Sequence, residues 1–231
     1  MIKTKIVGHK GAAGYAPENT LTSFQKAIDV GCDRAELDVR LTKDNQVVVF
    51  HDKEVSALTD GEGFVNEMTL DEIKKLNCGD GEKIPTLQEV VDLCKDKIDL
   101  QIELKAEGTP ELVNEIVVKN EIEDQVVITS FKENFLKEIK SLNPDLKVGL
   151  LFYTNEAMLK IWELTEEIPL DFFAPHSEMV TKEFIEKAHD IGKTVYAYRV
   201  NEKDLGDKLI SMGVDSIGTD FPKLFISRYN D

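Results

Sequence analysis

The chain has 231 residues, a length that suits one large α/β domain or two small ones and allows a full hydrophobic core. Its formal net charge of −16 argues against nucleic acid and anionic membrane surfaces as primary partners. No apolar run approaches the roughly 20 residues of a membrane span, and we expect no signal peptide before the first strand. The three cysteines are odd in number and lack metal-ligand spacing, so we expect reduced thiols in a cytoplasmic protein.

The first expected strand runs from Lys3 to Gly8 and leads into a loop of small residues that ends at Gly14. A loop of this composition lets the backbone approach a ligand closely. Asn19 or Thr20 is then expected to cap a helix with apolar residues at helical spacing, and Gly31 is expected to end that helix.

Two acids lie in the next apolar run, which predicts a β-hairpin over residues 35–51. Glu36 and Asp38 are two residues apart, so in a strand both carboxylates point to the same face. Two acids that face a core need a partner because isolated buried charge is costly, and a set of oxygen ligands favours Mg²⁺ or Ca²⁺. The alternative is that both acids form salt bridges on a solvated face, and the spacing alone leaves both interpretations open.

The same hairpin is expected to bring a histidine to the acids. Residues 43–46 have turn composition, and Val47–Phe50 are expected to form the return strand. If Thr42 and the first residue of that strand flank the turn, His51 lies directly opposite Asp38, with Cβ atoms about 5 Å apart. One hairpin would then hold two acids and a histidine side by side; the alternative is that His51 merely ends a strand.

A polar segment rich in Gly and Asp, residues 52–84, follows the hairpin and contains one short helical pattern, Thr69–Leu76. We expect it to be a small insertion over one mouth of the domain, because such loops are often functional. Beyond it, strands and helices alternate. The expected strands are Ile98–Leu104, Gln125–Ser130, Lys147–Phe152, Asp171–Ala174, Thr194–Val200 and Val214–Gly218, and the expected helices are Leu87–Cys94, Pro110–Lys119, Glu133–Leu142, Glu156–Glu166, Thr181–Ile191 and Asp204–Met212.

Together with strands that begin near residues 4 and 33, this pattern gives eight parallel strands joined by helices. It predicts an α/β fold in which residues 1–231 form one (β/α)₈ TIM barrel. An open, doubly wound sheet is the alternative, but no Gly-x-Gly-x-x-Gly turn supports it.

Polar residues collect at the C-terminal ends of the expected strands, where barrel enzymes place their active sites. These residues are His9, Glu36, Asp38, His51, Glu103, Lys105, Ser130, His176, Tyr198, Arg199 and Asp220. Glu103 would complete a set of three oxygen ligands, although it could also form a salt bridge with a helix. Lys105 beside three acids is a candidate phosphate contact, or a solvated lysine. His176 is the weaker histidine and is more often structural or exposed.

The chain resembles the glycerophosphodiester phosphodiesterase family almost from end to end. The motifs that carry the resemblance are His9-Lys10-Gly11, Pro17-Glu18-Asn19-Thr20, Glu36-Leu37-Asp38-Val39, Thr42-Lys43-Asp44, His51-Asp52, Ile84-Pro85-Thr86-Leu87, Glu103-Leu104-Lys105 and Gly218-Thr219-Asp220-Phe221-Pro222. The resemblance implies a distorted barrel with a small insertion after the second histidine. It also implies hydrolysis of glycerophosphodiesters to glycerol 3-phosphate and an alcohol, with a divalent cation.

The resemblance also implies roles for individual residues. Glu36, Asp38 and Glu103 look like the metal ligands, and His9 and His51 look like the pair that exchanges protons with the substrate. This leaves Mg²⁺ and Ca²⁺ both open as the cation.

Two positions depart from the family pattern. Lys10 stands where the family usually has Arg; it keeps the charge but loses the geometry for two parallel contacts to a phosphate. Tyr198 and Arg199 stand where the family often has Trp-Thr. We expect Lys10 and Lys105 to contact phosphate, Tyr198 to pack against glycerol, and Arg199 to bind a second anionic group.

The expected partner is a small-molecule glycerophosphodiester, with neither nucleic acid nor integral membrane association, and the protein is expected to be a monomer or homodimer. Two alternative functions remain open at this point. One is a related phospholipase-type phosphodiesterase on the same barrel, and the other is a barrel that binds a phosphodiester without catalysis. Neither a membrane-docking aromatic loop nor the loss of a histidine is evident in the sequence to favour them.

Overall fold

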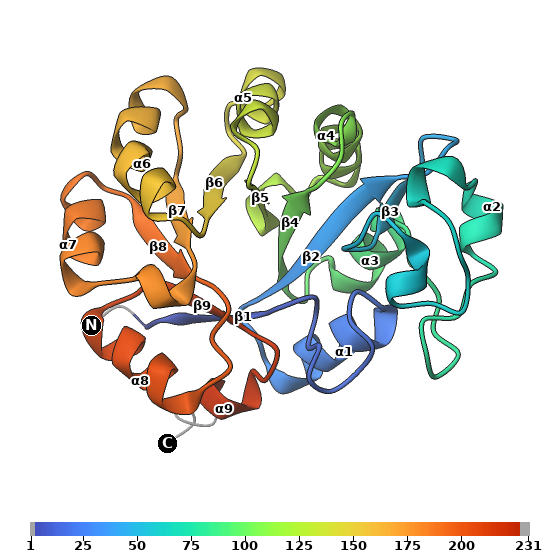
Figure 1. The fold of residues 1–231 in the computed structure, drawn as a ribbon, viewed down its shortest axis with the longest axis horizontal. Helices are drawn as coiled ribbons and strands as arrows, with labels where there is room; N and C mark the ends of the chain where they lie inside the picture. The colour runs from blue at the N-terminus through green and yellow to red at the C-terminus, as the bar shows by residue number, and fades with distance from the viewer. Residues whose placement is uncertain (1–2, 227–231) are drawn as a thin grey trace.

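A ring of parallel strands forms the centre of the computed structural model, which describes residues 3–226 (Figure 1). The eight strands of the ring are β1 (Lys5–Gly8), β2 (Arg34–Leu41), β4 (Asp99–Leu104), β5 (Val126–Ser130), β6 (Lys147–Phe152), β7 (Phe172–Pro175), β8 (Thr194–Ala197) and β9 (Ser216–Thr219). Neighbours in this order pair in parallel, and β9 pairs with β1, which closes the barrel. The expected (β/α)₈ TIM barrel is confirmed.

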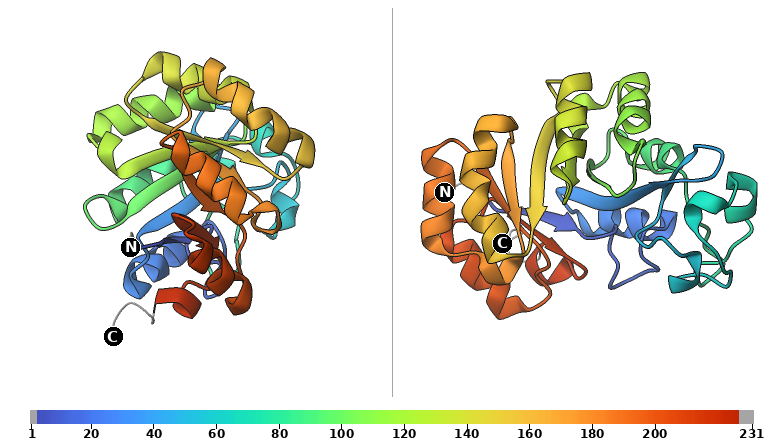
Figure 2. Two further views of the ribbon diagram at one scale, coloured as in Figure 1. Left: turned by 90° about the vertical axis from the view of Figure 1, so that its left-hand side faces the viewer. Right: turned by 45° about the horizontal axis from the view of Figure 1, so that its top comes forward.

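Helices surround the strands on the outside of the barrel, as Figure 2 shows in two further views. They are α1 (Leu21–Val30), α3 (Leu87–Cys94), α4 (Thr109–Asn120), α5 (Glu133–Leu142), α6 (Asn155–Glu167), α7 (Lys182–Asp190), α8 (Lys203–Met212) and α9 (Lys223–Ile226). Thr20, one of the two expected caps, accepts the amide of Ser23 at the start of α1, and left-handed Gly31 ends it. Helix α9 lies after Pro222, where the sequence predicted only a short tail.

The hydrophobic core has two parts because successive strand residues point to opposite faces. The larger part lies between strands and helices and includes Ile6, Phe24 and Phe173. A separate cluster from alternate strand positions fills the barrel interior, and its members are Val7, Val127, Leu151, Phe172, Ala174 and Tyr196. A Cβ at Gly218 would lie 2.1 Å from the hydroxyl of Tyr196, so this glycine makes room for the largest residue of the interior cluster.

The distortion of the barrel comes from β2, which has two partners along one edge. β1 pairs in parallel with its first residues, and β3 (Val47–Val49) pairs antiparallel with its last residues, opposite the edge that carries β4. The hairpin extends beyond the ring on the side where α2 is labelled in Figure 1. The loop after β1 therefore emerges next to the acids on β2.

The expected register of this hairpin is wrong by one residue. Val39 pairs with Val49, and the amide of Phe50 donates to the carbonyl of Asp38, so Asp38 lies opposite Phe50 instead of His51. The cause is the turn: Asn45 has a left-handed φ of 56° after a turn closed by its amide on the carbonyl of Thr42. A type I turn followed by a left-handed residue adds a bulge, which shifts the pairing by one.

Residues 52–84 form the expected insertion after the hairpin, built from η1 (Val55–Ala57), η2 (Val65–Glu67) and α2 (Leu70–Ile73). The segment projects beyond β3 in Figure 1 and in the right view of Figure 2. It has an apolar cluster of its own, made by Val48, Phe50, Val55, Val65, Ile73 and Ile84. The helix α2 is shorter than the expected Thr69–Leu76, and a capping box between Thr69 and Glu72 fixes its start.

The other strand and helix bounds follow the expectations to within a few residues. The largest difference is β8, which ends at Ala197 and not at Val200, so Tyr198 and Arg199 follow the strand. After the end of β8, Tyr198 forms an isolated parallel β-bridge with His176. Within residues 3–226, no helix has the length and apolar character needed to cross a membrane. All three cysteines are free, as expected.

Candidate active site

A cavity of about 260 Å³ opens at the C-terminal ends of the barrel strands and brings the predicted site residues together. All nine of them line it: His9, Lys10, Glu36, Asp38, His51, Glu103, Lys105, Tyr198 and Arg199. The cavity is also lined by His176, the weaker histidine candidate, and by four residues to which the sequence assigned no role, namely Gln101, Phe131, Leu151 and Tyr196. Strand ends distributed around the whole barrel therefore contribute to one site.

Three buried carboxylates form the floor of the cavity. In the register of the two parallel strands, Asp38 on β2 lies opposite Glu103 on β4. Glu36 lies two residues earlier on the same face of β2. One carboxylate oxygen of each residue lies within 4.8 Å of those of the other two. The exposed fractions are 4% for Glu36, 1% for Asp38 and 8% for Glu103, so the solvated-face alternative is wrong.

The pKa values of these carboxyls reflect their crowding. Burial, with repulsion from Asp38 and Glu103, holds the pKa of Glu36 well above its usual value. Burial, with repulsion from Asp38, raises the pKa of Glu103 to about 8. Burial acts to raise the pKa of Asp38 as well, but the nearby charges of Lys105, His51 and Lys10 outweigh it, and that pKa is lowered.

Lys105 compensates only part of this charge. Its ammonium lies 2.7 Å from Oε1 of Glu103 and 3.2 Å from Oδ1 of Asp38, an oxygen that accepts no hydrogen bond among the described residues. When all three carboxyls are ionised, one ammonium leaves two negative charges, and without a further cation burial and this excess raise the pKa values of Glu36 and Glu103. A divalent cation would balance the two charges, and buried carboxylate oxygens are the ligands that Mg²⁺ and Ca²⁺ prefer, so the residues fit such an ion.

The loop after β1 holds two of the carboxylates in place. The amide of Lys10 donates to Oε2 of Glu36 over 2.8 Å, and the side-chain amide of Asn19 donates to Oδ2 of Asp38 over 2.9 Å. Both loop residues have left-handed backbone, with φ of 50° and 58°. The sequence placed Asn19 only at the start of a helix, whereas the structure shows that it also orients an acid of the site.

Lys10 itself is only 7% exposed, although it carries a charge. Its ammonium donates to Oε1 of Glu18 over 2.5 Å while its side chain lines the cavity. The family-typical arginine is thus replaced by a lysine whose charge is held at the edge of the site. Glu18, which the sequence analysis names only as part of a family motif, is the residue that holds it.

His9 is oriented by an aspartate from the other end of the chain. Its Nδ1 lies 2.6 Å from Oδ1 of Asp220, which follows β9, and its Nε2 lies 4.0 Å from Oε2 of Glu36. Asn201 in turn donates to Oδ2 of Asp220 over 2.5 Å and accepts its backbone amide over 2.9 Å. This chain of contacts fixes the ring and directs Nε2 to the carboxylate cluster.

His51 reaches the cavity from the bend that follows β3. Its side chain is 39% exposed, and its Nδ1 lies 3.2 Å from Oδ1 of Asp52. Its carbonyl accepts Nε and Nη2 of Arg40 over 2.8 and 2.6 Å, which fixes the bend. Burial lowers the pKa of His51, and this effect exceeds the opposing attraction of Asp38.

Aromatic side chains form one wall of the cavity. Tyr198 stacks on Tyr196, with ring centroids 6.2 Å apart, and meets Phe131 edge to face at 6.0 Å. Phe131 meets Tyr153 at 5.7 Å, so the aromatic wall continues from the cavity to the surface. The hydroxyl of Tyr198 donates to the carbonyl of Phe152, which leaves the ring as the contact surface.

The sequence profile of the glycerophosphoryl diester phosphodiesterase family matches residues 9–224 of this chain. A glycerophosphodiester phosphodiesterase from Caldanaerobacter subterraneus is 36% identical over 239 residues, with 98% of each chain covered. Another, from Bacillus altitudinis, is 32% identical over 238 residues, with 95% of each chain covered.

Solved structures give the same result at the level of the fold. A phosphodiesterase from Oleispira antarctica, solved with the product sn-glycerol-3-phosphate, has a TM-score of 0.89 and 28% identity, and the match covers 98% of this chain and 97% of that one. A glycerophosphodiester phosphodiesterase from Thermotoga maritima has a TM-score of 0.86 and 27% identity, with 98% of each chain covered. With a profile match over nearly the whole barrel and relatives aligned almost end to end, the chain belongs to the glycerophosphoryl diester phosphodiesterase family.

Proposed function

We propose that this protein hydrolyses glycerophosphodiesters to glycerol 3-phosphate and an alcohol, with a divalent cation held by Glu36, Asp38 and Glu103. The observation that carries the proposal is the buried set of three carboxylates beside two histidines in one cavity. Family membership and the relative described with sn-glycerol-3-phosphate as its product support the same substrate class. We further propose that residues 1–231 act as one catalytic domain with residues 52–84 as an insertion.

The cavity offers separate places for the parts of such a substrate. Lys10, Lys105 and Arg199 bring positive charge to its walls, which favours a phosphodiester anion despite the acidic chain. The rings of Tyr198 and Phe131 give an apolar face against which the carbon chain of glycerol packs. The glycerol moiety therefore lies on the aromatic side and the phosphate lies over the carboxylates.

The two histidines supply the proton transfers. A ring nitrogen of one histidine accepts the proton of a glycerol hydroxyl while the oxygen of that hydroxyl bonds to phosphorus. The other histidine protonates the oxygen of the departing alcohol, and a cyclic phosphate remains. Water then opens the cyclic phosphate with the two proton transfers reversed. When bound, the cation would neutralise charge on the phosphate oxygens and favour ionisation of the attacking hydroxyl. Asp220 keeps Nε2 of His9 directed into the site throughout.

A substrate panel tests the reaction class and the cation together. Glycerophosphocholine, glycerophosphoethanolamine and glycerophosphoglycerol, each assayed with Mg²⁺, Mn²⁺ and Ca²⁺, are expected to release glycerol 3-phosphate with at least one cation. Coupled detection with glycerol-3-phosphate dehydrogenase measures that product directly. Intact phospholipid in the same panel tests the phospholipase-type alternative. The lipid keeps its acyl chains and cannot yield glycerol 3-phosphate, so its turnover is followed by the head-group alcohol or alcohol phosphate that is freed. Turnover of the lipid alone would overturn the proposal.

Lys10→Ala is expected to lower kcat/KM by about 10- to 1000-fold. A charge-assisted contact to phosphate contributes about 1.5–3 kcal/mol and more in a dry site. The substitution adds no backbone strain because both residues carry a Cβ in the same left-handed conformation. Lys10→Arg should keep much of the activity. Steady-state kinetics checks this, with Lys26→Ala as the control because Lys26 is an exposed lysine on α1. Equal kcat/KM for Lys10→Ala and the wild type would show that Lys10 does not contact the phosphate.

A further inference from the structure

A second cavity of about 390 Å³ adjoins the active site, between the insertion and the loops that follow β4 and β5. We call it the basic groove; the residues that define it here are Arg40, Lys53, Phe64, Glu67, Glu107 and Lys132. Lys105 lines both this groove and the active-site cavity, so the two spaces meet at its side chain. The sequence analysis did not predict that a basic groove would adjoin the active site.

The groove is positively charged in a strongly acidic protein. The chain has 44 acidic and 28 basic side chains, whereas the groove has more bases than acids even when the ion-paired Lys105 is left out. Glu107 lies 3.4 Å from the ammonium of Lys132, so these two charges offset each other. Among the described residues, neither Arg40 nor Lys53 forms a direct ion pair with a carboxylate.

Arg40 links the groove to the catalytic residues. The guanidinium of Arg40 donates two N–H groups to the carbonyl of His51. This acceptor is neutral, so the contact leaves the charge of Arg40 in place. Lys53 follows His51 by two residues and is exposed at the groove. A ligand in the groove therefore lies beside the segment that carries one of the two histidines.

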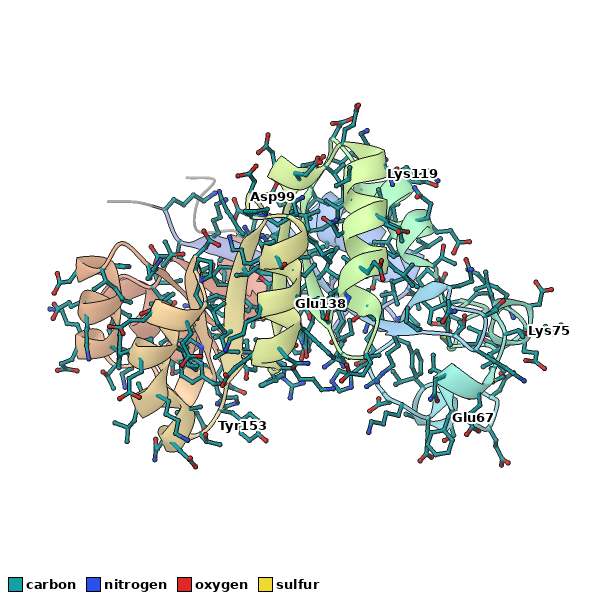
Figure 3. All side chains as sticks on the ribbon, turned by 90° about the horizontal axis from the view of Figure 1, so that it is seen from above. Glu67, Lys75, Asp99, Lys119, Glu138 and Tyr153 are labelled. Atoms are coloured by element: carbon teal, nitrogen blue, oxygen red, sulfur yellow. The ribbon has the colours of Figure 1, made fainter. Side chains whose placement is uncertain are left out.

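The position of the groove suits the departing alcohol, the part of the substrate that the proposed binding mode has not yet placed. The aromatic wall that ends at Tyr153 leaves the active site on one side, and the groove with Glu67 leaves it on another. Figure 3 shows Glu67 and Tyr153 well apart on one side of the molecule, opposite Asp99 at the start of β4. With glycerol on the aromatic wall, the groove adjoins the phosphate position at Lys105 and offers a place for the other ester group.

We infer that the departing alcohol lies in the basic groove and that the groove favours alcohols that carry an anionic group. This inference rests on the proposed hydrolysis and specifies its substrate class. A carboxylate or phosphate on the alcohol meets Lys53 and Arg40. An ammonium group is repelled by both and meets Glu67 as the one groove carboxylate, among the described residues, that has no ion pair. Phe64 is 41% exposed at the same groove and gives the carbon chain of the alcohol an apolar contact.

Glycerophosphoserine and glycerophosphoethanolamine test this inference because they differ by one carboxylate. The wild type is expected to show a higher kcat/KM for the serine ester. Lys53→Gln should lower the serine-to-ethanolamine ratio by about two- to fivefold, the effect of one exposed charge, and Lys53→Glu by about five- to twentyfold. Added salt should reduce the preference because exposed charges are screened. Arg40 is left unchanged because it holds His51.

Lys75→Glu is the matched control. It makes the same charge change in the same insertion, at an exposed residue that does not line the groove and lies away from Glu67 in Figure 3. The ratio should stay at the wild-type value. Calorimetric titration with O-phosphoserine and O-phosphoethanolamine adds a readout independent of turnover, in which Lys53→Glu should weaken only the first ligand.

The outcomes separate the two proposals. Normal turnover with the same ratio in the wild type and Lys53→Glu, or equal affinities for the two phosphorylated ligands, would overturn the inference and leave the hydrolysis intact. No turnover of either ester with any cation, together with a retained preference for O-phosphoserine that Lys53→Glu removes, would overturn the hydrolysis and support the anion preference of the groove.

Discussion

Glu36→Gln, Asp38→Asn and Glu103→Gln are each expected to lower kcat/KM by about 10²- to 10⁴-fold and to weaken binding of the divalent cation. A bound cation supplies several kcal/mol of charge stabilisation to the transition state, and each 1.36 kcal/mol corresponds to about tenfold in rate. The three carboxylates are buried and close enough to share one ion, so the loss of one oxygen charge is not replaced by solvent. The amides keep the shape of each side chain.

Metal removal is the companion measurement. Protein treated with EDTA should be inactive, and activity should return on addition of Mg²⁺, Mn²⁺ or Ca²⁺ in the wild type but not in the three variants. Glu138→Gln is the control, because Glu138 is exposed on α5, where Figure 3 labels it, and does not line the active-site cavity. Full activity of EDTA-treated protein with no metal added would exclude the metal-dependent mechanism.

Thermal unfolding without metal should separate Asp38 from the two glutamates. Glu36→Gln and Glu103→Gln remove one of three crowded buried carboxylates, so the metal-free Tm should stay the same or rise. Despite burial, the pKa of Asp38 is instead lowered by the charges of Lys105, His51 and Lys10, so its ionised form stabilises the folded state, and the metal-free Tm of Asp38→Asn should fall. In all three variants, the rise in Tm that a saturating cation gives the wild type should shrink.

The barrel was predictable because its determinants are local and repeated. Each strand is a short apolar run, each helix has its own periodicity, and turn residues separate them; the bounds of α3, α5 and β6 are those expected. The acids were predictable for the same reason. The two-residue spacing of Glu36 and Asp38 fixes a shared face in any strand, whatever that strand pairs with.

The hairpin register was not predictable from composition alone. Residues 42–46 have turn chemistry in either register, and the difference depends on the left-handed conformation of Asn45. Asparagine tolerates that conformation but does not require it. His51 still reaches the cavity because the chain bends after β3 and Arg40 holds the bend by the carbonyl of His51. The prediction placed His51 in one cavity with the acids, but with the wrong pairing.

The residues that sequence reasoning missed are those that act through contacts distant in the chain. His9 and Asp220 are 211 positions apart, and Asn201 joins them from the loop after β8. The sequence placed Asp220 among the polar residues at the strand ends, where active-site residues collect, but nothing in it indicated the contact with His9. No comparable signal marks Phe131, because an aromatic residue after a strand is as readily part of the core.

His9→Ala and His51→Ala are each expected to lower kcat by several orders of magnitude, because a positioned acid or base contributes about 10²–10⁴-fold and the two act on one phosphodiester. The double variant should lose little more than the worse single variant, since groups that act as a unit are not additive. Strictly additive losses would place the two histidines in separate steps or separate sites.

The pH dependence of the wild type gives a second test of the pair. One histidine must be neutral to accept a proton and the other must be protonated to donate one, so kcat/KM should fall on both sides of an optimum. The two limbs belong to the coupled pair and not to either ring alone. In each single alanine variant the residual rate should lose this bell shape. If His9→Ala keeps the bell-shaped pH profile of the wild type, both limbs of the profile belong to other groups.

Asp220→Asn separates orientation from proton transfer at His9. Asp220 accepts from Nδ1 of His9 over 2.6 Å and so keeps Nε2 as the nitrogen that faces Glu36 and the substrate. An amide at this position can donate to Nδ1 and favour the other tautomer, as in proton-transfer triads built on an aspartate. We expect kcat to fall by about 10- to 1000-fold with KM nearly unchanged, because the ring remains in place but presents the wrong nitrogen. In the His9→Ala background the same change should have almost no further effect, and a full additional loss there would show that Asp220 acts on the reaction independently of His9.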